Sequence, residues 1–129
     1  MTTTTTGLTT ISLVCVPTVE QDKAVAFYES LGFEKRTDTP FGGGYRWIEV
    51  YPPEGTTAIA LAPPPPDSGA VQPTNTGITL STNDIDATHA ALQKLGIDVD
   101  AQVSRMGDPV PPMFWFRDPT GHTLMVVES

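Results

Sequence analysis

The sequence has few cysteines and few basic side chains. Cys15 is the only cysteine among 129 residues, which excludes an internal disulfide and a zinc site built from thiolates. Seven lysine and arginine residues stand against fifteen acidic residues, and the formal net charge of −8 argues against nucleic acid and anionic membrane surfaces as partners. The sequence also lacks a visible signal peptide and an apolar run long enough to span a membrane, so we expect a cytoplasmic protein.

The residues that are present form a pattern that occurs twice. Residues 19–33 (VEQDKAVAFYESLGF) have apolar side chains at helical spacing, and Gly32 can adopt the left-handed backbone that ends a helix. The pattern returns in residues 83–97 (NDIDATHAALQKLGI), and residues 47–55 (WIEVYPPEG) likewise parallel residues 113–121 (MFWFRDPTG). Two matches at nearly one offset predict a duplicated module of about half the chain.

Each expected helix has an apolar stripe that should face a core. Thr18 and Glu20 offer side-chain oxygens to the unpaired N–H groups at the start of the first helix. The stripe of the first helix consists of Ala24, Phe27, Tyr28 and Leu31. The stripe of the second helix consists of Thr88, Ala91, Leu92 and Leu95. The residues that we expect to be buried between sheet and helices are Val14, Val16, Phe27, Leu31, Ile48, Ile59, Ile78, Leu80, Leu92, Leu95 and Phe114.

Segments of strand character surround both helices and predict an α+β fold with the order β-α-β-β-β in each half. In the first half they are residues 11–16, 34–39, 45–51 and 57–62. In the second half they are residues 76–82, 99–105, 113–117 and 123–128. The length fits one domain. We expect a disordered threonine-rich tail (1–8), then a single domain (9–128) made of module one (9–62), a linker rich in proline and glycine (63–75) and module two (76–128).

With VxxxxAxxFYxxLGF, then a second xDxDAxxxxLxxLGI, then FRDPTGH before a final strand, the sequence resembles the vicinal oxygen chelate superfamily. That superfamily includes glyoxalase I, bleomycin resistance proteins and extradiol dioxygenases. The resemblance covers about residues 9–128. It implies two βαβββ modules whose mixed sheets form a cup, with the helices on the convex side. It also implies a homodimer, and a half-cup with an exposed apolar face is consistent with that expectation.

In the catalytic members of that superfamily, each of four strands carries one His, Glu or Gln ligand for a metal ion. The resemblance assigns these positions to Leu13, Ala60, Gly77 and Met125. None of the four supplies the oxygen or nitrogen donor that a hard divalent cation needs. We therefore expect no metal, no cofactor and no catalytic residue, and the resemblance argues against metal-dependent lyase or dioxygenase activity.

The remaining polar residues have ordinary structural interpretations. His122 follows the turn at Asp118 and is expected to bond backbone groups there, whereas His89 lies off the helical stripe and is expected to be solvated. Cys15 should face the cup beside Leu13 as a buried, inert thiol. Glu49 shares a strand face with Trp47, and it is the best candidate for a charged group inside the cup.

Aromatic and sulfur-containing side chains on the duplicated strands could line a small-molecule cavity. The expected ligand-binding residues are Tyr45, Trp47, Glu49, Met113, Trp115, Met125, Leu13 and Cys15. Alternatively, these side chains simply fill the cup or cover a subunit interface.

The sequence thus favours a metal-independent small-molecule-binding protein that sequesters a drug or metabolite, with a planar or cationic ligand. One alternative is a lyase, isomerase or dioxygenase-like enzyme of the same superfamily that uses other residues. A non-catalytic interaction module is a further alternative.

Overall fold

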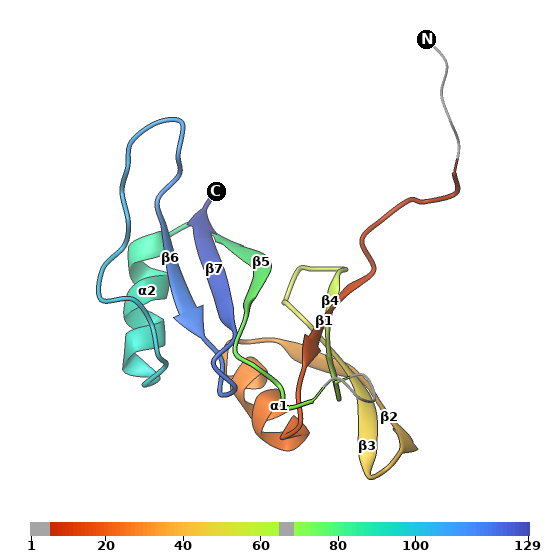
Figure 1. The fold of residues 1–129 in the computed structure, drawn as a ribbon. Helices are drawn as coiled ribbons and strands as arrows, with labels where there is room; N and C mark the ends of the chain where they lie inside the picture. Colours follow the sequence, from red (N-terminus) through yellow and green to blue (C-terminus); the bar gives the residue numbers. More distant parts are fainter. Residues whose placement is uncertain (1–5, 65–68) are drawn as a thin grey trace.

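The computed structural model describes residues 6–64 and 69–129 (Figure 1). Most of the expected tail and residues 65–68 of the linker lie outside this range, and residues 6–8 are exposed. Neither helix of the described residues is long and apolar enough to cross a membrane. The elements of the first half are β1 (Leu13–Pro17), α1 (Gln21–Ser30), β2 (Glu34–Gly42), β3 (Tyr45–Tyr51) and β4 (Ala58–Ala62). The elements of the second half are β5 (Asn75–Thr82), α2 (Ile85–Lys94), β6 (Met113–Arg117) and β7 (Thr123–Glu128).

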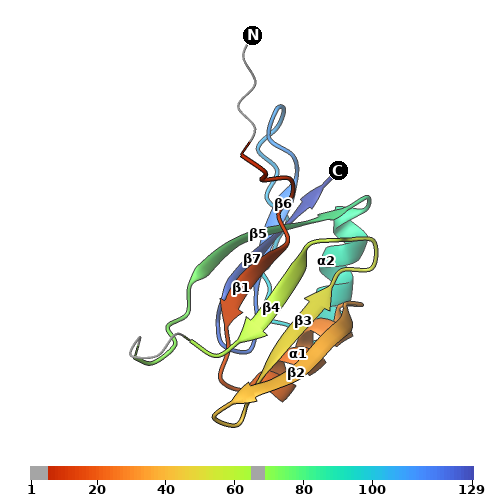
Figure 2. The ribbon, with the colours of Figure 1, turned by 90° about the vertical axis from the view of Figure 1, so that its right-hand side faces the viewer.

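The strands form two sheets, and the three strands of the second follow the same order and directions as three strands of the first. Sheet A has the order β1-β4-β3-β2, and sheet B has the order β5-β7-β6. In both sheets the first strand of the module runs parallel to the last, and the other neighbours are antiparallel. Figures 1 and 2 show α1 beside sheet A and α2 beside sheet B. This repeated arrangement confirms the α+β class and the duplicated module.

The strand expected at residues 99–105 is not formed, and sheet B therefore has three strands among the described residues. The segment pairs with β6 through two isolated bridges, which join Val99 to Phe116 and Ser104 to Met113. The Asp100 carboxylate also accepts bonds from the N–H of Trp115 (3.3 Å) and the guanidinium of Arg117 (2.8 Å). Between these bridges the chain bends at residues 101–102, whose side chains are exposed. Because this bend carries the backbone away from β6, the ladder is interrupted after each bridge.

Both helices end in the same way, as the two glycines predict. Gly32 and Gly96 have φ angles of +96° and +76°. After α1, the N–H of Phe33 donates to the carbonyl of Tyr28 (3.1 Å), and after α2 the N–H of Ile97 donates to the carbonyl of Leu92 (3.2 Å). These are the long bonds of a Schellman motif, in which a left-handed residue turns the chain back onto the helix.

The starts of the helices differ, and the expected side-chain cap of α1 is wrong. Asp84 caps α2, since its carboxylate accepts a bond from the N–H of Ala87 (3.1 Å). Glu20 occupies the same position in α1 but makes no such bond, and the hydroxyl of Thr18 donates instead to the carbonyl of Val16. A short carboxylate reaches back to its own helix more readily than the longer glutamate does.

The buried helix faces lie about one residue away from the expected stripes. The matched pairs Gln21/Ile85, Val25/His89 and Tyr28/Leu92 are all buried. In contrast, Phe27 and Leu31 are only partly buried, Ala91 is exposed, and Leu95 is 53% exposed, so its expected burial is wrong.

His89 is therefore buried rather than solvated as expected. Only 8% of its surface is exposed. Its Nε2 lies 2.7 Å from the carbonyl oxygen of Asp100, and its ring packs edge-on against Phe114 with the centroids 4.9 Å apart. The partner carbonyl allows a polar ring to occupy the position that Val25 fills in the first module.

One hydrophobic core joins the two modules. Of the residues expected in it, Val16, Ile48, Ile59, Leu92 and Phe114 are buried, and Val14, Ile78 and Leu80 are half-buried. Several large buried side chains were not expected; they are Phe33, Ile85, Phe116 and Leu124. Because the core draws on both sheets and both helices, each module completes the burial of the other.

Polar contacts also connect the modules. The ring of His122 bonds backbone groups, as expected, but these groups belong to Pro17 and Thr74 and not to the turn at Asp118. The Nε2 of this fully buried ring lies 2.9 Å from the carbonyl oxygen of Pro17, and the N–H of Thr74 donates to Nδ1 (3.2 Å). Since Nδ1 accepts, Nε2 carries the hydrogen and donates to Pro17. Nearby, the hydroxyl of Tyr28 donates to the carboxylate of Asp118 (3.4 Å). We call these contacts the inter-module clamp.

Candidate ligand-binding site

A carboxylate held between two aromatic side chains lies on the face of sheet A opposite α1. In β3, Ile48 and Val50 are fully buried, so the alternation of the strand places Trp47, Glu49 and Tyr51 on the other face, where they are half-exposed. The indole N–H of Trp47 donates to one oxygen of Glu49 (2.8 Å), and the hydroxyl of Tyr51 donates to the other (3.0 Å). We call this face the open face of sheet A.

The surroundings of Tyr51 keep it in the donor form. The bond to the Glu49 carboxylate, together with partial desolvation and the negative charge of that group, raises the pKa of Tyr51 above its ordinary value. The guanidinium carbon of Arg36 lies 4.4 Å from the centre of the Tyr51 ring, and Arg36 also pairs with Glu34 (3.0 Å). Tyr51 therefore stays protonated and can donate to Glu49 at neutral pH.

Leu13 and Cys15 extend the open face of sheet A onto the next strands. Cys15 pairs with Ala60, which in turn pairs with Glu49, so the three side chains lie in one row across β1, β4 and β3. Cys15 is exposed, and the expected burial of its thiol is wrong. The side chain is uncovered because it lies on the open face of sheet A, whereas Val16, the next residue of β1, is fully buried on the other face.

The other expected site residues lie on the matching face of sheet B. Trp115 pairs with Met125, which pairs with Thr79, and this row corresponds to the row of Glu49, Ala60 and Cys15 in sheet A. Trp115, Met113 and Met125 are half-exposed, whereas their neighbours in β6 and β7 are buried. The structure thus gathers the expected residues into two groups on different sheets.

The four positions that the superfamily uses for metal ligands do not fit a metal ion. Leu13, Ala60 and Gly77 have no donor atom in their side chains, and Met125 offers only a thioether sulfur. Within residues 6–64 and 69–129, no group of three or more His, Cys, Asp or Glu side chains is placed to hold a metal.

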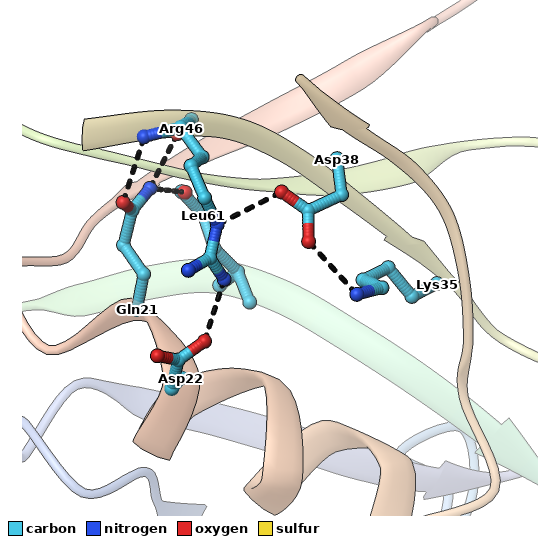
Figure 3. A network of polar contacts seen from close by, with 6 residues as sticks. All are labelled: Gln21, Asp22, Lys35, Asp38, Arg46 and Leu61. Atoms are coloured by element: carbon cyan, nitrogen blue, oxygen red, sulfur yellow. Dashed lines mark hydrogen bonds and ion pairs between the residues drawn. The ribbon is translucent and has the colours of Figure 1, made fainter. Parts of the chain in front are cut away.

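A polar network at the start of α1 fixes the hairpin that carries Tyr45 and Trp47 (Figure 3). The amide of Gln21 accepts from the N–H of Arg46 (2.9 Å) and donates to the carbonyl of Leu61 (2.8 Å). Gln21 is buried, and it satisfies backbone groups of both β3 and β4 where the two strands diverge. The amide therefore ties α1 to the strand that carries Glu49.

Charged side chains continue this network at the surface (Figure 3). The guanidinium of Arg46 pairs with Asp22 (2.6 Å) and Asp38 (2.8 Å), and Lys35 also binds Asp38 (2.8 Å). The bond to Arg46 lowers the pKa of Asp22, and the bond to Lys35 is the main cause of the lowered pKa of Asp38. These pairs orient the hairpin, and Tyr45 lies beside Arg46 in a shallow surface hollow.

The sequence did not indicate an apolar cleft that lies between the two modules. The cleft has a volume of about 350 Å³ and runs between the edge strands β1 and β5. A second hollow of about 560 Å³ adjoins it, and the two share Phe33, Pro52, Thr79 and Leu80. Because the cleft is formed by residues from both halves, no single stretch of the sequence could reveal it.

A family model described as the Glyoxalase/Bleomycin resistance protein/Dioxygenase superfamily matches residues 10–126. No curated protein sequence gives a significant match.

Several solved structures are similar over nearly their whole length. TnmS3, described as an antibiotic binding protein from Streptomyces sp. CB03234, is 30% identical; the match covers 96% of this chain and 98% of that one, with a TM-score of 0.79. A superfamily member from Sphaerobacter thermophilus DSM 20745 is 31% identical, with coverage of 95% and 98% and a TM-score of 0.83. A glyoxalase/bleomycin resistance protein from Streptomyces sp. CB03234 is 33% identical, with coverage of 89% and 96% and a TM-score of 0.71.

Proposed function

The chain belongs to the Glyoxalase/Bleomycin resistance protein/Dioxygenase superfamily, and from that premise we propose that it is a metal-independent small-molecule-binding protein that sequesters a drug or metabolite in the cytoplasm. One observation carries the proposal: the open face of sheet A presents Trp47, Glu49 and Tyr51 in a bonded arrangement, whereas the superfamily's metal positions lack donor side chains. Binding surfaces of this kind need orienting polar groups among aromatic ones, and they need no reactive centre. The description of TnmS3 as antibiotic-binding supports the proposal.

The direct test is to screen planar aromatic natural products by native mass spectrometry and tryptophan fluorescence. A bound compound should change the tryptophan fluorescence, because Trp47 lies in the proposed site and Trp115 is the only other tryptophan in the sequence. Trp47→Ala, on the open face of sheet A, should weaken binding about tenfold or more, since losing a stacked aromatic side chain costs about 1–3 kcal/mol. Unchanged affinity in both Trp47→Ala and Trp115→Ala would show that the ligand binds elsewhere. Turnover of the bound compound would favour the alternative of an enzyme.

We also propose that the protein is a homodimer. The strands β1 and β5 are both sheet edges, and edges expose unpaired backbone groups that can pair with another chain. The apolar cleft lies between these edges, and Ile11 beside it is 72% exposed. A dimer formed through the edges would set the open face of sheet A next to the matching face of sheet B of the second copy. Light scattering at tens of micromolar should give twice the chain mass, and a monomer would defeat the proposal.

A further inference from the structure

We propose that Trp47, Glu49 and Tyr51 form a recognition site for a positively charged nitrogen of the small-molecule ligand. This inference rests on the proposed binding function and adds the chemical class of the ligand. The three side chains follow one another along the exposed side of β3, and we call them the carboxylate clamp.

The carboxylate clamp fixes the direction of the Glu49 carboxylate before a ligand binds. Each oxygen of Glu49 accepts one hydrogen bond from a neighbour two positions away, from Trp47 at 2.8 Å and from Tyr51 at 3.0 Å. A free glutamate samples many rotamers, and ordering it on binding would reduce affinity. Each carboxylate oxygen can accept more than one bond, so both retain lone pairs for a ligand.

The charge of Glu49 is not neutralised by a neighbouring side chain. None of the ion pairs formed within residues 6–64 and 69–129 includes Glu49. The nearby cation, Arg36, binds Glu34 and lies over the ring of Tyr51. Trp47 and Tyr51 are neutral donors, which orient the carboxylate and leave its negative charge available. A half-buried carboxylate of this kind attracts a cation more strongly than a fully solvated one does.

The aromatic partners favour the same ligand chemistry. The rings of Trp47 and Tyr51 flank the carboxylate, and aromatic faces attract cations through their quadrupoles. Arg36 already uses the Tyr51 ring in this way. The formal net charge of −8 also draws cations towards the protein and disfavours anions. A ligand with a protonated amine or quaternary nitrogen beside a planar ring would meet all of these features.

The test compares the affinities of two planar probes of similar shape, the 10-methylacridinium cation and the neutral acridone. Each probe is titrated against the full chain. Wild type should bind the cation more tightly. Glu49→Gln keeps the size of the side chain and its acceptor oxygen, but removes the charge. This variant should weaken binding of the cation about tenfold and leave acridone unaffected, because a charge-assisted contact is lost only for the cation. Glu29→Gln, an exposed helical position, is the control for net charge.

The outcomes separate this inference from the proposed function. Equal binding of both probes, with no effect of Glu49→Gln, would overturn the inference while supporting a small-molecule site. Failure of both probes to bind wild type would overturn the inference, and failure of the whole natural-product panel would overturn the proposed function as well. Tyr51→Phe keeps the ring but removes one donor, so it should reduce the preference for the cation over acridone. An unchanged preference would show that Tyr51 does not position the carboxylate.

Discussion

At the scale of single residues, Tyr28 is a fully buried polar residue that connects the two modules. Its side chain is fully buried, and its hydroxyl donates to Asp118 of the other module. Tyr28→Phe should lower the free energy of unfolding by about 1–2 kcal/mol, because a buried carboxylate oxygen loses a donor. Urea denaturation measures the loss. Tyr45→Phe, at a half-exposed position, should change stability little and serves as the control.

The same residue makes stability depend on alkaline pH. Burial and the neighbouring Asp118 carboxylate raise the pKa of Tyr28 above the ordinary value of about 10. In the unfolded chain the phenol loses its proton near pH 10, whereas the folded protein keeps it. The contribution of the protonated Tyr28 phenol to the free energy of unfolding is therefore complete below pH 10. Above pH 10 it falls by about 1.4 kcal/mol per pH unit. Unfolding titrations between pH 8 and 11 should show a steeper decline in wild type than in Tyr28→Phe. Equal slopes would mean that the phenol is accessible to solvent.

At the scale of elements, the two helix ends form a matched pair for substitution. Gly32 and Gly96 both have positive φ angles, and an added methyl group would meet only Pro53 at 3.8 Å in the first case and nothing within 4 Å in the second. Each Gly→Ala change should therefore cost only the backbone strain, about 1–2 kcal/mol. Gly32→Asn and Gly96→Asn should cost less, since asparagine tolerates this conformation. A thermal shift equal for alanine and asparagine would contradict the explanation.

The elements also show what could be predicted from the sequence. Both helices, their glycine ends and all strands but one were predictable, because apolar spacing and breaker residues act locally. The shift of the buried face of α1 away from the expected stripe was not predictable. Gln21 is buried on that face because it bonds Arg46 and Leu61, which are distant in sequence. In α2, His89 is likewise buried by the carbonyl of Asp100. A polar residue with a distant partner defeats a prediction made from hydrophobicity alone.

The expected site residues illustrate the same limit. The alternation of side chains along a strand correctly assigned Trp47 and Glu49 to one face of β3. It also assigned Trp115 to the matching face of β6, the repeat of β3. The bonds from Trp47 and Tyr51 to Glu49 depend on rotamers, which alternation does not specify. The separation of the residues into two groups depends on how the sheets pack, and the apolar cleft has the same origin.

At the scale of the whole molecule, the inter-module clamp should decide whether the protein unfolds in one step. Trp47 lies in module one and Trp115 in module two, so the variants Trp115→Phe and Trp47→Phe report on one module each. With His122 present, both should unfold at the same urea concentration. His122→Ala should cost about 3 kcal/mol and separate the two transitions, because the fully buried ring is removed and the Pro17 carbonyl and the Thr74 N–H lose their partner. His89→Ala, a buried histidine within module two, should destabilise without separating them. Coincident transitions in His122→Ala would show that the apolar core alone couples the modules.

The inter-module clamp has a consequence for the synthesis of the protein. Pro17 and His122 are 105 positions apart. A ribosome adds roughly 5–20 residues per second, so the Pro17 carbonyl is made about 5 to 20 s before the ring that binds it. Asp118, the partner of Tyr28, is also made late. During this interval the first half must exist as a nascent chain with its inner face uncovered. The apolar residues of module one that pack against module two therefore stay exposed until the last strands emerge, and exposed apolar surface of this kind promotes aggregation.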